Sequence, residues 1–341
     1  MKVVLVGATG AVGTEILSIL QERDFPLQEL VPVASPRSAG RKLDFNGDQV
    51  EVVALAPDVF EDADIALFDV PDELSLEWAP VAVDKGAIVV DNSAAFRLDP
   101  DVPLVVPEIN PATASERPKG IIASPNCTTL AMVVPLAALH ERVPVERLVI
   151  ASYQAASGSG KAGVDDLWDQ TETASKEADA VTRGFGRDVL EAGDAFPHPI
   201  AMNVIPQCGS LKEHGYTSEE LKLCYETRKI MALPNLAVTA TCVRVPVVVG
   251  HGVAVHAEFS QPITPEQARA ILEAAPGVEV VDDPAADVYP TPLEAAGRDA
   301  CYVGRIRQDL FDNKSLEFFC VADNLRKGAA LNTVQVAELL V

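Results

Sequence analysis

A glycine-rich run directly after the first apolar segment constrains the fold of this 341-residue chain more than any other feature. Residues 2–6, K-V-V-L-V, are typical of a buried strand, and the apolar periodicity of residues 13–22 predicts an amphipathic helix. Between them lies the run G-A-T-G-A-V-G, residues 7–13. Glycines there allow a tight turn, and a helix N-terminus offers free N–H groups to a pyrophosphate. A strand–helix turn that merely needs glycine is the alternative.

The remaining patterns divide the chain into two halves. The first half alternates short apolar runs with helical patterns, which predicts a parallel, doubly wound sheet of the Rossmann type. Its predicted strands are residues 2–6, 30–34, 65–68, 87–90, 104–106 and 121–123, with a helix at 76–84. The second half is β-rich and predicts an α+β domain, with residues 249–253 as a turn between antiparallel neighbours. Its predicted strands are residues 148–153, 238–249, 253–259, 302–307 and 316–321. Residues 171–193 are predicted to include a surface loop, and residues 328–340 a final helix.

The charge balance limits the possible partners. The formal net charge is -23, so the surface repels nucleic acid and anionic membranes, and neither is expected as a partner. Six cysteines occur singly, without a C-x-x-C pair, and no metal site is expected. Because Met1 and Lys2 lead straight into the first strand without a secretory signal, we expect reduced thiols and a cytoplasmic location.

The end of the second predicted strand bears on the choice of dinucleotide. An NAD enzyme usually has Asp or Glu there for the ribose hydroxyls. Here the run is A-S-P-R-S-A-G-R, with Ser35, Arg37, Ser38 and Arg41. Because guanidinium groups bind a phosphate in a bidentate manner, this loop favours NADP over NAD. A solvated basic loop is the alternative.

Cys127 is the candidate nucleophile. It lies in S-P-N-C-T-T, just before the apolar helical run 130–139. A cysteine at a helix N-terminus is placed in a field that favours the thiolate. Asn126 and nearby backbone N–H groups are candidate donors to an oxyanion. Most isolated cysteines are small buried hydrophobes, so the local pattern alone leaves both interpretations open.

The chain resembles the aspartate-semialdehyde dehydrogenase family from end to end. The motifs that carry the resemblance are G-A-T-G-A-V-G, A-S-P-R-S-A-G, V-V-D-N-S-A-A-F-R, D-V-P-L-V-V-P-E-I-N, S-P-N-C-T-T, S-Y-Q-A-A-S-G-S-G, P-I-A-M-N-V-I-P-Q, A-T-C-V-R-V-P-V followed by G-H, and D-N-L-R-K-G-A-A-L-N. The resemblance implies a Rossmann-type NADP domain at 1–127 plus 326–341 and an α+β catalytic and dimerisation domain at 128–325. It also implies a homodimer or homotetramer.

The resemblance assigns a role to each matching position. It makes Cys127 the nucleophile and His251 the acid/base, and Gln154 would orient the acyl intermediate. Arg244 would hold the substrate carboxylate, and Glu219 would meet the amine, although Glu220 is close enough to leave the register open. Arg97 and Lys222, with Asn126 nearby, would bind the phosphoryl group. The implied cofactor contacts are Gly7, Thr9, Gly10, Ala11, Val12, Gly13, Ser35, Arg37, Ser38, Ser157, Gly158 and Asn324.

The implied reaction reduces L-4-aspartyl phosphate through a cysteine thioester, in the biosynthesis of lysine, threonine, methionine and isoleucine. A thiolate displaces phosphate, and an imidazole is a natural proton carrier at neutral pH. Each residue also has an ordinary structural interpretation. His251 is then a surface turn histidine, Arg244 an outward strand residue, Arg97 a loop cation, and Glu219 with Lys222 a helical ion pair.

One segment departs from the family pattern. After I-A-L-F the family usually has a loop of small residues near the cofactor, of the S-A-G type. Here the loop reads D-V-P-D-E, residues 69–73. The cofactor contacts of this loop, and with them the strict preference for NADP, are therefore open.

Three other functions compete with this interpretation. N-acetyl-γ-glutamyl-phosphate reductase uses the same thioester chemistry, but Glu219 argues against it. The Tyr/Lys reductases and epimerases share G-x-x-G-x-x-G, and a Y-x-x-x-K occurs at Tyr225 and Lys229. That mechanism has no use for Cys127 or His251. A catalytically silent binding subunit is the third, and the intact chemical residues argue against it.

Overall fold

The computed structural model describes residues 1–341 and forms two compact units. The first unit comprises residues 1–130, 225–234 and 325–341, and the second comprises residues 131–224 and 235–324. The boundary falls inside two helices, α3 (Cys127–Arg142) and α6 (Ser218–Ile230). No helix of the chain is long and apolar enough to cross a membrane.

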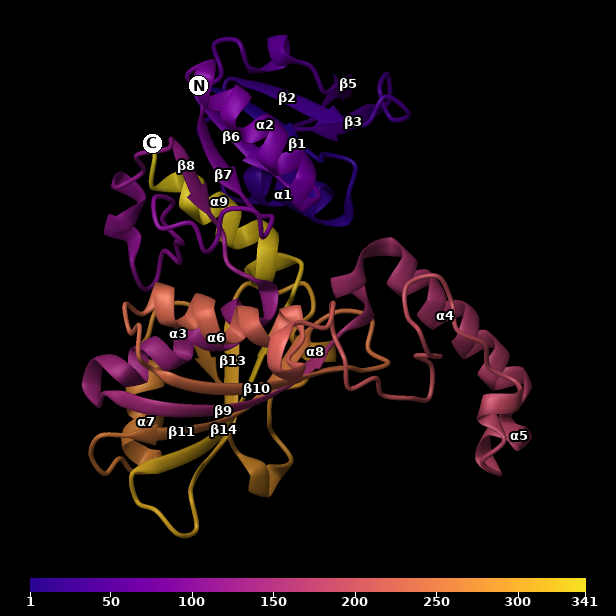
Figure 1. Ribbon diagram of the computed structural model, residues 1–341, viewed down its shortest axis with the longest axis vertical. Helices are drawn as coiled ribbons and strands as arrows, with labels where there is room; N and C mark the ends of the chain where they lie inside the picture. Colours follow the sequence, from indigo (N-terminus) through magenta and orange to yellow (C-terminus); the bar gives the residue numbers. More distant parts are fainter. The chain divides into compact units, whose positions relative to one another are not determined.

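The first unit is built on a six-stranded parallel sheet in the order β5-β2-β1-β6-β7-β8 (Figure 1). Its strands are β1 (Lys2–Val6), β2 (Glu29–Ala34), β5 (Val53–Ala54), β6 (Ile65–Phe68), β7 (Ile88–Asp91) and β8 (Ile121–Ala123). Because consecutive side chains of a strand point to opposite faces, each central strand buries residues on both sides. Ile65 and Leu67 join the core cluster that includes residues of α1 (Ala11–Glu22) and α9 (Leu331–Glu338). Phe68 stacks on Phe60, which lies against Trp78 of α2 (Asp72–Asp84).

Sequence predictions for this unit are confirmed for several buried strands and are wrong or incomplete elsewhere. Strands β1, β6 and β8 have the predicted limits. The predicted strand 104–106 was wrong, since only Leu104 makes an isolated bridge, to Ala123. The hairpin β3 (Lys42–Phe45) and β4 (Asp48–Glu51) was not predicted, because its residues are mostly exposed and polar. The final helix begins as a π-helical turn, Arg326–Ala330, before α9.

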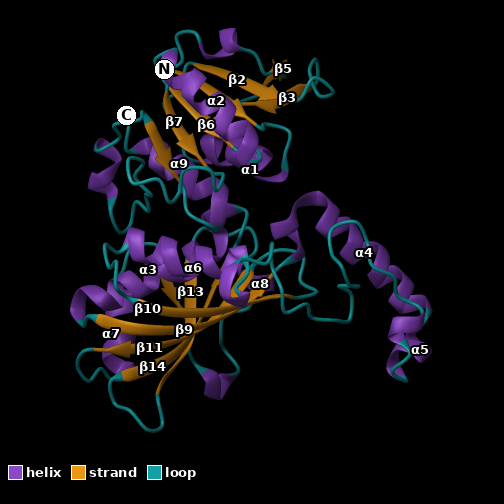
Figure 2. Ribbon diagram, in the orientation of Figure 1, coloured by secondary structure: helices purple, strands orange, loops and turns teal.

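The second unit is built on a mixed six-stranded sheet in the order β10-β9-β11-β14-β13-β12 (Figure 2). Its strands are β9 (Val145–Gln154), β10 (Ala237–Arg244), β11 (His251–Phe259), β12 (Val278–Val280), β13 (Cys301–Gln308) and β14 (Ser315–Ala322). Burial alternates along them: Leu148 and Ile150 are buried, whereas Val149 and Tyr153 are exposed. The sheet therefore has one buried and one open face. The unit also contains helices α7 (Pro265–Glu273) and α8 (Pro292–Ala295). Helices α4 and α5 are described below.

The predicted turn at residues 249–253 was wrong. Strand β9 lies between β10 and β11, parallel to β10 and antiparallel to β11. Residues 245–250 instead run beside the segment after β9, where Ala156 and Ser157 donate their backbone N–H groups to the carbonyl oxygens of Val247 and Val248. Pro246, which lacks an N–H, lies just after the end of β10. Apolar content alone made this segment resemble a continued strand.

A helical arm extends from the sheet of the second unit (Figure 1). It consists of α4 (Gly160–Lys176) and the short α5 (Ala178–Thr182). The prediction that residues 171–193 include a surface loop is confirmed for the residues after α5, while α4 and α5 occupy the earlier part. Pairs such as Lys176 with Glu172 and Arg183 with Asp179 have helical spacing. The polar composition had concealed that periodicity.

Candidate active site

The glycine loop of the first unit has the shape of a cradle for a dinucleotide. Gly7 has a φ of 97°, and a Cβ there would overlap the carbonyl oxygen of Asp69. A Cβ on Gly13 would overlap the carbonyl oxygen of Gly7, so the helix packs directly on the turn. Gly10 precedes α1, whose first turn holds no acidic side chain. The loop thus presents backbone N–H groups and the positive end of the helix dipole, which suits a pyrophosphate.

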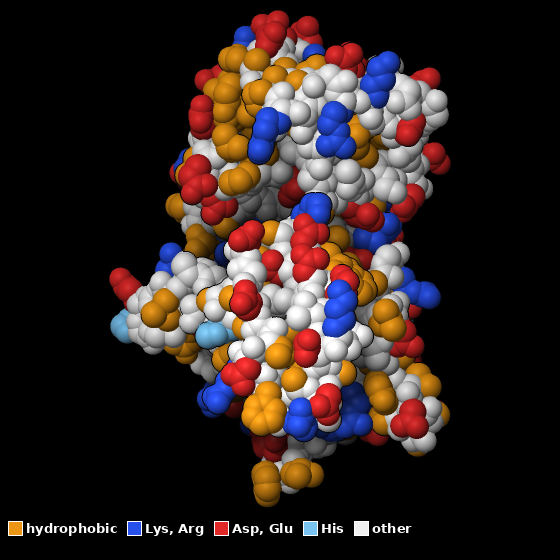
Figure 3. Space-filling view, turned by 90° about the vertical axis from the view of Figure 1, so that its right-hand side faces the viewer, with side chains coloured by type: hydrophobic (Ala, Val, Ile, Leu, Met, Phe, Trp, Pro, Cys, Tyr) orange, Lys and Arg blue, Asp and Glu red, His pale blue; other side chains and the backbone are white.

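The basic loop after β2 lies on the surface of the first unit. Ser35, Arg37 and Arg41 are exposed, and Ser38 is half-buried. Neither arginine forms an ion pair. Acidic side chains are spread over the face of the molecule shown in Figure 3, with isolated basic groups among them. An unpaired guanidinium is available to an anionic ligand.

Cys127 is the first residue of α3, is half-buried and forms no disulfide. Asn126 caps this helix, because its Oδ1 accepts hydrogen bonds from the backbone N–H groups of Thr128 (3.0 Å) and Thr129 (3.3 Å). The backbone N–H of Asn126 donates to Oε2 of Glu226 at 2.6 Å. The residue next to the candidate nucleophile is therefore held by both its side chain and its backbone.

Arg97 forms a buried ion pair in the first unit. Its Nη1 lies 3.2 Å from Oε1 of Glu226, whose side chain is 1% exposed. Its Nε donates to the carbonyl oxygen of Ser124 and its Nη2 to that of Asn92. Sequence reasoning missed Glu226, although it lies seven residues after Glu219 on the same helix and so on a similar face. Removing one partner of such a buried pair typically costs about 3–5 kcal/mol.

Three predicted residues of the second unit meet at one edge of its sheet. Gln154 ends β9, Arg244 ends β10, and His251 begins β11. Gln154 and Arg244 are register partners in the parallel pair. Strand β11 runs in the opposite direction on the other side of β9, so its first residue reaches the same edge.

His251 is completely buried, which rules out its interpretation as a surface turn histidine. Its Nδ1 accepts a hydrogen bond of 3.0 Å from the backbone N–H of Ala155. The proton of the neutral ring must then reside on Nε2. Burial, and secondly the positive charge of Arg244, lower the pKa of His251 to about 3. At neutral pH the ring is therefore an uncharged hydrogen-bond donor.

Arg244 points toward the same place as His251. Its Nη1 donates to the carbonyl oxygen of Ala155 at 2.6 Å, and its guanidinium lies over the Phe196 ring at 5.7 Å. A Cβ on Gly158 would stand 2.7 Å from that Nη1 and 3.2 Å from Nε2 of His251. Glycine at this position therefore leaves room beside two proton donors. The interpretation of Arg244 as an outward strand residue is excluded, since it is 7% exposed.

The two neighbouring glutamates of α6 have different surroundings. Nε2 of Gln154 lies 3.4 Å from Oε2 of Glu219, and Nζ of Lys222 lies 2.6 Å from its Oε1. The carboxylate of Glu220 instead accepts from the backbone N–H groups of Thr217 (2.7 Å) and Cys242 (3.1 Å). Glu220 is thus used in the fold, and Glu219 faces the predicted site residues.

Ser157 and Asn324 also come together. Nδ2 of Asn324 donates to Oγ of Ser157 at 2.9 Å, and its Oδ1 accepts from the backbone N–H of Gly250 at 2.8 Å. Asn324 therefore joins the segment after β9 to the residue before His251. Both residues are buried.

The Tyr/Lys alternative is not supported by the geometry. Nζ of Lys229 donates to the carbonyl oxygens of Arg97, Asp99 and Val102 at 2.7–2.8 Å. Three acceptors occupy all three donors of an ammonium group. Lys229 is therefore committed to structure.

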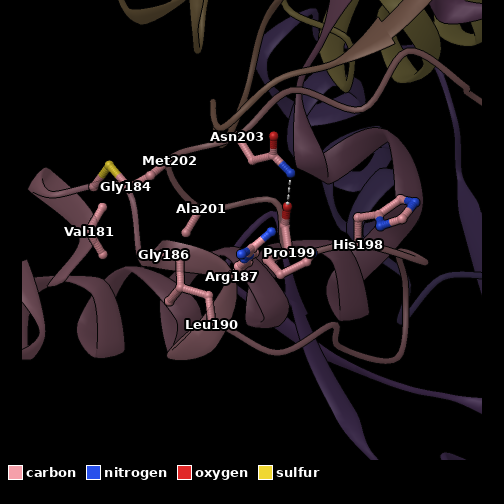
Figure 4. Close-up of a pocket in the computed structure, with 10 residues that line it drawn as sticks. All are labelled: Val181, Gly184, Gly186, Arg187, Leu190, His198, Pro199, Ala201, Met202 and Asn203. Atoms are coloured by element: carbon pink, nitrogen blue, oxygen red, sulfur yellow. Dashed lines mark hydrogen bonds between the residues drawn. The ribbon is translucent and has the colours of Figure 1, made fainter.

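One cavity of the second unit lies beside the arm and has a volume of about 380 Å³ (Figure 4). Its lining includes Arg187, His198 and Asn203, and the Asn203 amide donates to the carbonyl oxygen of Pro199 at 2.8 Å. None of the predicted site residues lines it. The chemical groups described above thus lie outside this cavity.

Comparison with known proteins gives the same class for both halves of the chain. The family model described as semialdehyde dehydrogenase, NAD binding domain, matches residues 2–117. The model described as semialdehyde dehydrogenase, dimerisation domain, matches residues 136–327. The chain is thus an oxidoreductase with a nicotinamide dinucleotide cofactor, and the predicted Rossmann-type fold with a second α/β domain is confirmed.

Relatives specify the family further. An aspartate-semialdehyde dehydrogenase of Aquifex aeolicus is 47% identical over 342 residues, which cover 100% of this chain and 98% of the relative. That of Streptomyces akiyoshiensis is 49% identical over 343 residues, with the same two coverages. The crystal structure of aspartate semialdehyde dehydrogenase II of Vibrio cholerae complexed with ASA has a TM-score of 0.92 and 43% identity, covering 99% of this chain and 97% of that one. The chain belongs to the aspartate-semialdehyde dehydrogenase family.

The protonation state of His251 leads to a first prediction. In ¹⁵N-histidine NMR, His251 should show the neutral Nε2–H tautomer and keep it as the pH is lowered from 7 through about 5, because burial and Arg244 disfavour the imidazolium. Loss of the signal in His251→Asn assigns it, with His256→Asn as the control. An imidazolium signal from His251 at neutral pH would contradict the geometry.

Proposed function

We propose that this enzyme converts L-4-aspartyl phosphate into L-aspartate 4-semialdehyde, with NADPH as reductant and a thioester on Cys127 as intermediate. The observation that carries the proposal is the pair of proton donors beside Gly158, Nε2 of His251 and Nη1 of Arg244. A thioester reduction needs a donor toward the carbonyl oxygen and a cation for the substrate carboxylate. The reaction belongs to the biosynthesis of lysine, threonine, methionine and isoleucine.

In the first step the thiolate of Cys127 attacks the acyl carbon of the substrate. A C–S bond forms, the C–O bond to the phosphoryl group breaks, and inorganic phosphate leaves. The cap that Asn126 forms on α3 supports this role, because it fixes the first turn of the helix, where Cys127 lies. We propose that Arg97 and Lys222 bind the phosphoryl group; both are cationic, although each already has a carboxylate partner.

In the second step the thioester carbonyl becomes a tetrahedral hemithioacetal oxyanion. The nicotinamide dinucleotide supplies the hydride for this reduction when it is bound. The Nε2–H of His251 has the polarity needed to stabilise the oxyanion by donating a hydrogen bond to it. Collapse of the hemithioacetal breaks the C–S bond, releases the aldehyde and regenerates the thiolate.

Three further side chains are proposed to orient the substrate. Arg244 would bind the α-carboxylate, and Glu219 the α-ammonium group. The contact between Gln154 and Glu219 supports a shared role, in which Gln154 orients the acyl group. Glu220 is not proposed for this role, since backbone N–H groups occupy its carboxylate.

For the cofactor we propose NADP rather than NAD. The support is local: two exposed arginines without ion-pair partners follow β2, where an NAD site would use a carboxylate. Ser35, Arg37 and Ser38 would contact the 2′-phosphate. The other proposed contacts are Gly7, Thr9, Gly10, Ala11, Val12, Gly13, Ser157, Gly158 and Asn324.

We also propose a homodimer, or a tetramer built from dimers. The open sheet face of the second unit exposes Val149 and Tyr153, and Tyr153 packs against Phe319 at 6.0 Å. The arm exposes Trp168 and Phe185. Apolar groups that remain exposed on a folded unit commonly mark an association surface.

The assignment of domains and compartment is likewise proposed. Residues 1–127 and 326–341 would bind the dinucleotide, and residues 128–325 would serve catalysis and dimerisation. A cytoplasmic location is supported by the six cysteines, none of which forms a disulfide.

A steady-state assay tests the proposed reaction. With aspartate semialdehyde and NADP, reduction of NADP should require inorganic phosphate, and Cys127→Ser should lower kcat by at least about a thousandfold, because a hydroxyl is a poor nucleophile at neutral pH. Cys224→Ser is the control, since its buried Sγ donates to the backbone carbonyl oxygen of Val238 in the fold. Turnover without phosphate would refute the proposal.

A second variant tests the cofactor. Arg37→Ala should raise the KM for NADPH about 10- to 100-fold, as expected for loss of a charge-assisted hydrogen bond, and should leave that for NADH nearly unchanged. Arg183→Ala removes an exposed arginine directly after α5 as the control. Equal effects of Arg37→Ala on both cofactors would rule out a 2′-phosphate contact.

A further inference from the structure

The carboxyl group of Asp69 lies directly over the glycine loop. Asp69 follows β6, and its backbone N–H donates to the carbonyl oxygen of Val6 at 2.9 Å. Its Oδ1 accepts a hydrogen bond of 3.0 Å from Nδ2 of Asn92. Its Oδ2 would stand 3.7 Å from a Cβ on Gly10. One carboxylate oxygen is thus fixed, and the other faces the residue that precedes α1.

This position coincides with the anion-binding end of α1. Gly10 provides no side chain to cap the helix, and the first turn holds no acidic residue. The partial positive charge there favours a nearby anion, whether it comes from a ligand or from the protein. In this chain the carboxylate of Asp69 is the protein's own anion at that end.

No cation compensates Asp69. It forms no ion pair, and the nearby guanidinium of Arg97 is paired with Glu226. From β7, the buried Asp91 adds a like charge, although Ser75 and Ser93 hydrogen-bond to it. From α2, the first turn contributes Asp72, bonded to the N–H of Ala94 at 2.8 Å, and the exposed Glu73. The charged groups that β7 and the first turn of α2 contribute near Asp69 are therefore acidic.

We propose that Asp69 limits the affinity of the dinucleotide site, because its carboxylate competes with the cofactor pyrophosphate for the N-terminal end of α1. Two anions at one helix terminus share a single partial charge and repel each other. Steric demand alone explains why residue 7 is glycine, but it gives no reason for a carboxylate at residue 69. The inference rests on the proposed cofactor site of the first unit.

Protonation supplies an independent signature of this competition. Burial is the main cause, and Asp91 a further one, of a raised pKa for Asp69. A neutral carboxyl group does not repel phosphate. Affinity for the dinucleotide should therefore rise as the pH is lowered toward the pKa of Asp69, and a variant without the charge should lack this rise.

Equilibrium binding tests the inference without turnover. NADPH or NADH is titrated with wild type, Asp69→Asn or Glu73→Gln, and the Kd is obtained from the fluorescence of the dinucleotide. Asp69→Asn keeps an oxygen that can accept from Asn92. This variant should lower the Kd of both cofactors by the same factor, about three- to tenfold, because both contain the pyrophosphate. Glu73→Gln removes an exposed charge from the same loop and should leave both affinities unchanged.

The outcomes separate this inference from the proposed function. If wild type binds neither dinucleotide, the proposed cofactor site fails. If wild type binds and Asp69→Asn binds equally or more weakly, the competition is refuted; weaker binding would show that Asp69 accepts a hydrogen bond from the cofactor. The advantage of Asp69→Asn should shrink as the pH is lowered, and a constant advantage overturns the electrostatic account. If the Asp69→Asn variant does not fold, Asp69→Ser replaces it in the same titrations.

Discussion

The backbone of one residue, Ala155, holds the two side chains on which the proposed chemistry depends. Its N–H donates to Nδ1 of His251, and its carbonyl oxygen accepts from Nη1 of Arg244. The first bond places the imidazole proton on Nε2, and the second fixes the guanidinium beside it. Both bonds exist because β9, β10 and β11 reach one edge of the sheet, and the segment after β9 passes between the other two. The order of the strands therefore determines which ring nitrogen of the histidine carries the proton.

The proposed nucleophile depends on a separate network within the first unit. Asn126 caps the helix that begins at Cys127, and the carboxylate of Glu226 holds the backbone N–H of Asn126 and the guanidinium of Arg97. These groups are buried, so each charge requires its partner. A strongly acidic protein with a net charge of -23 thus keeps this arginine neutralised internally, whereas Arg37 and Arg41 remain unpaired on the surface.

Sequence patterns predicted the elements whose burial is uniform and the residues whose chemistry is distinctive. The strands at 2–6, 65–68 and 121–123 match because buried parallel strands are short apolar runs. The wrong turn at 249–253 shows the limit: adjacency in sequence does not reveal that β9 lies between β10 and β11. The contacts of Glu226 and the position of Asp69 over Gly10 could not be predicted for the same reason, since both depend on residues far apart in the sequence. The proximity of Glu219, rather than Glu220, to Gln154 depends on helix rotation, which sequence spacing leaves open.

The central claim is that the substrate passes through a thioester on Cys127, and trapping that species tests it most directly. The enzyme is mixed with aspartate semialdehyde and NADP without phosphate, quenched in acid and digested. The account predicts a single burst of NADPH equal to the enzyme concentration and one aspartyl group on the peptide that contains Cys127. An aspartyl group on another residue, or a burst without any acylated peptide, would contradict it.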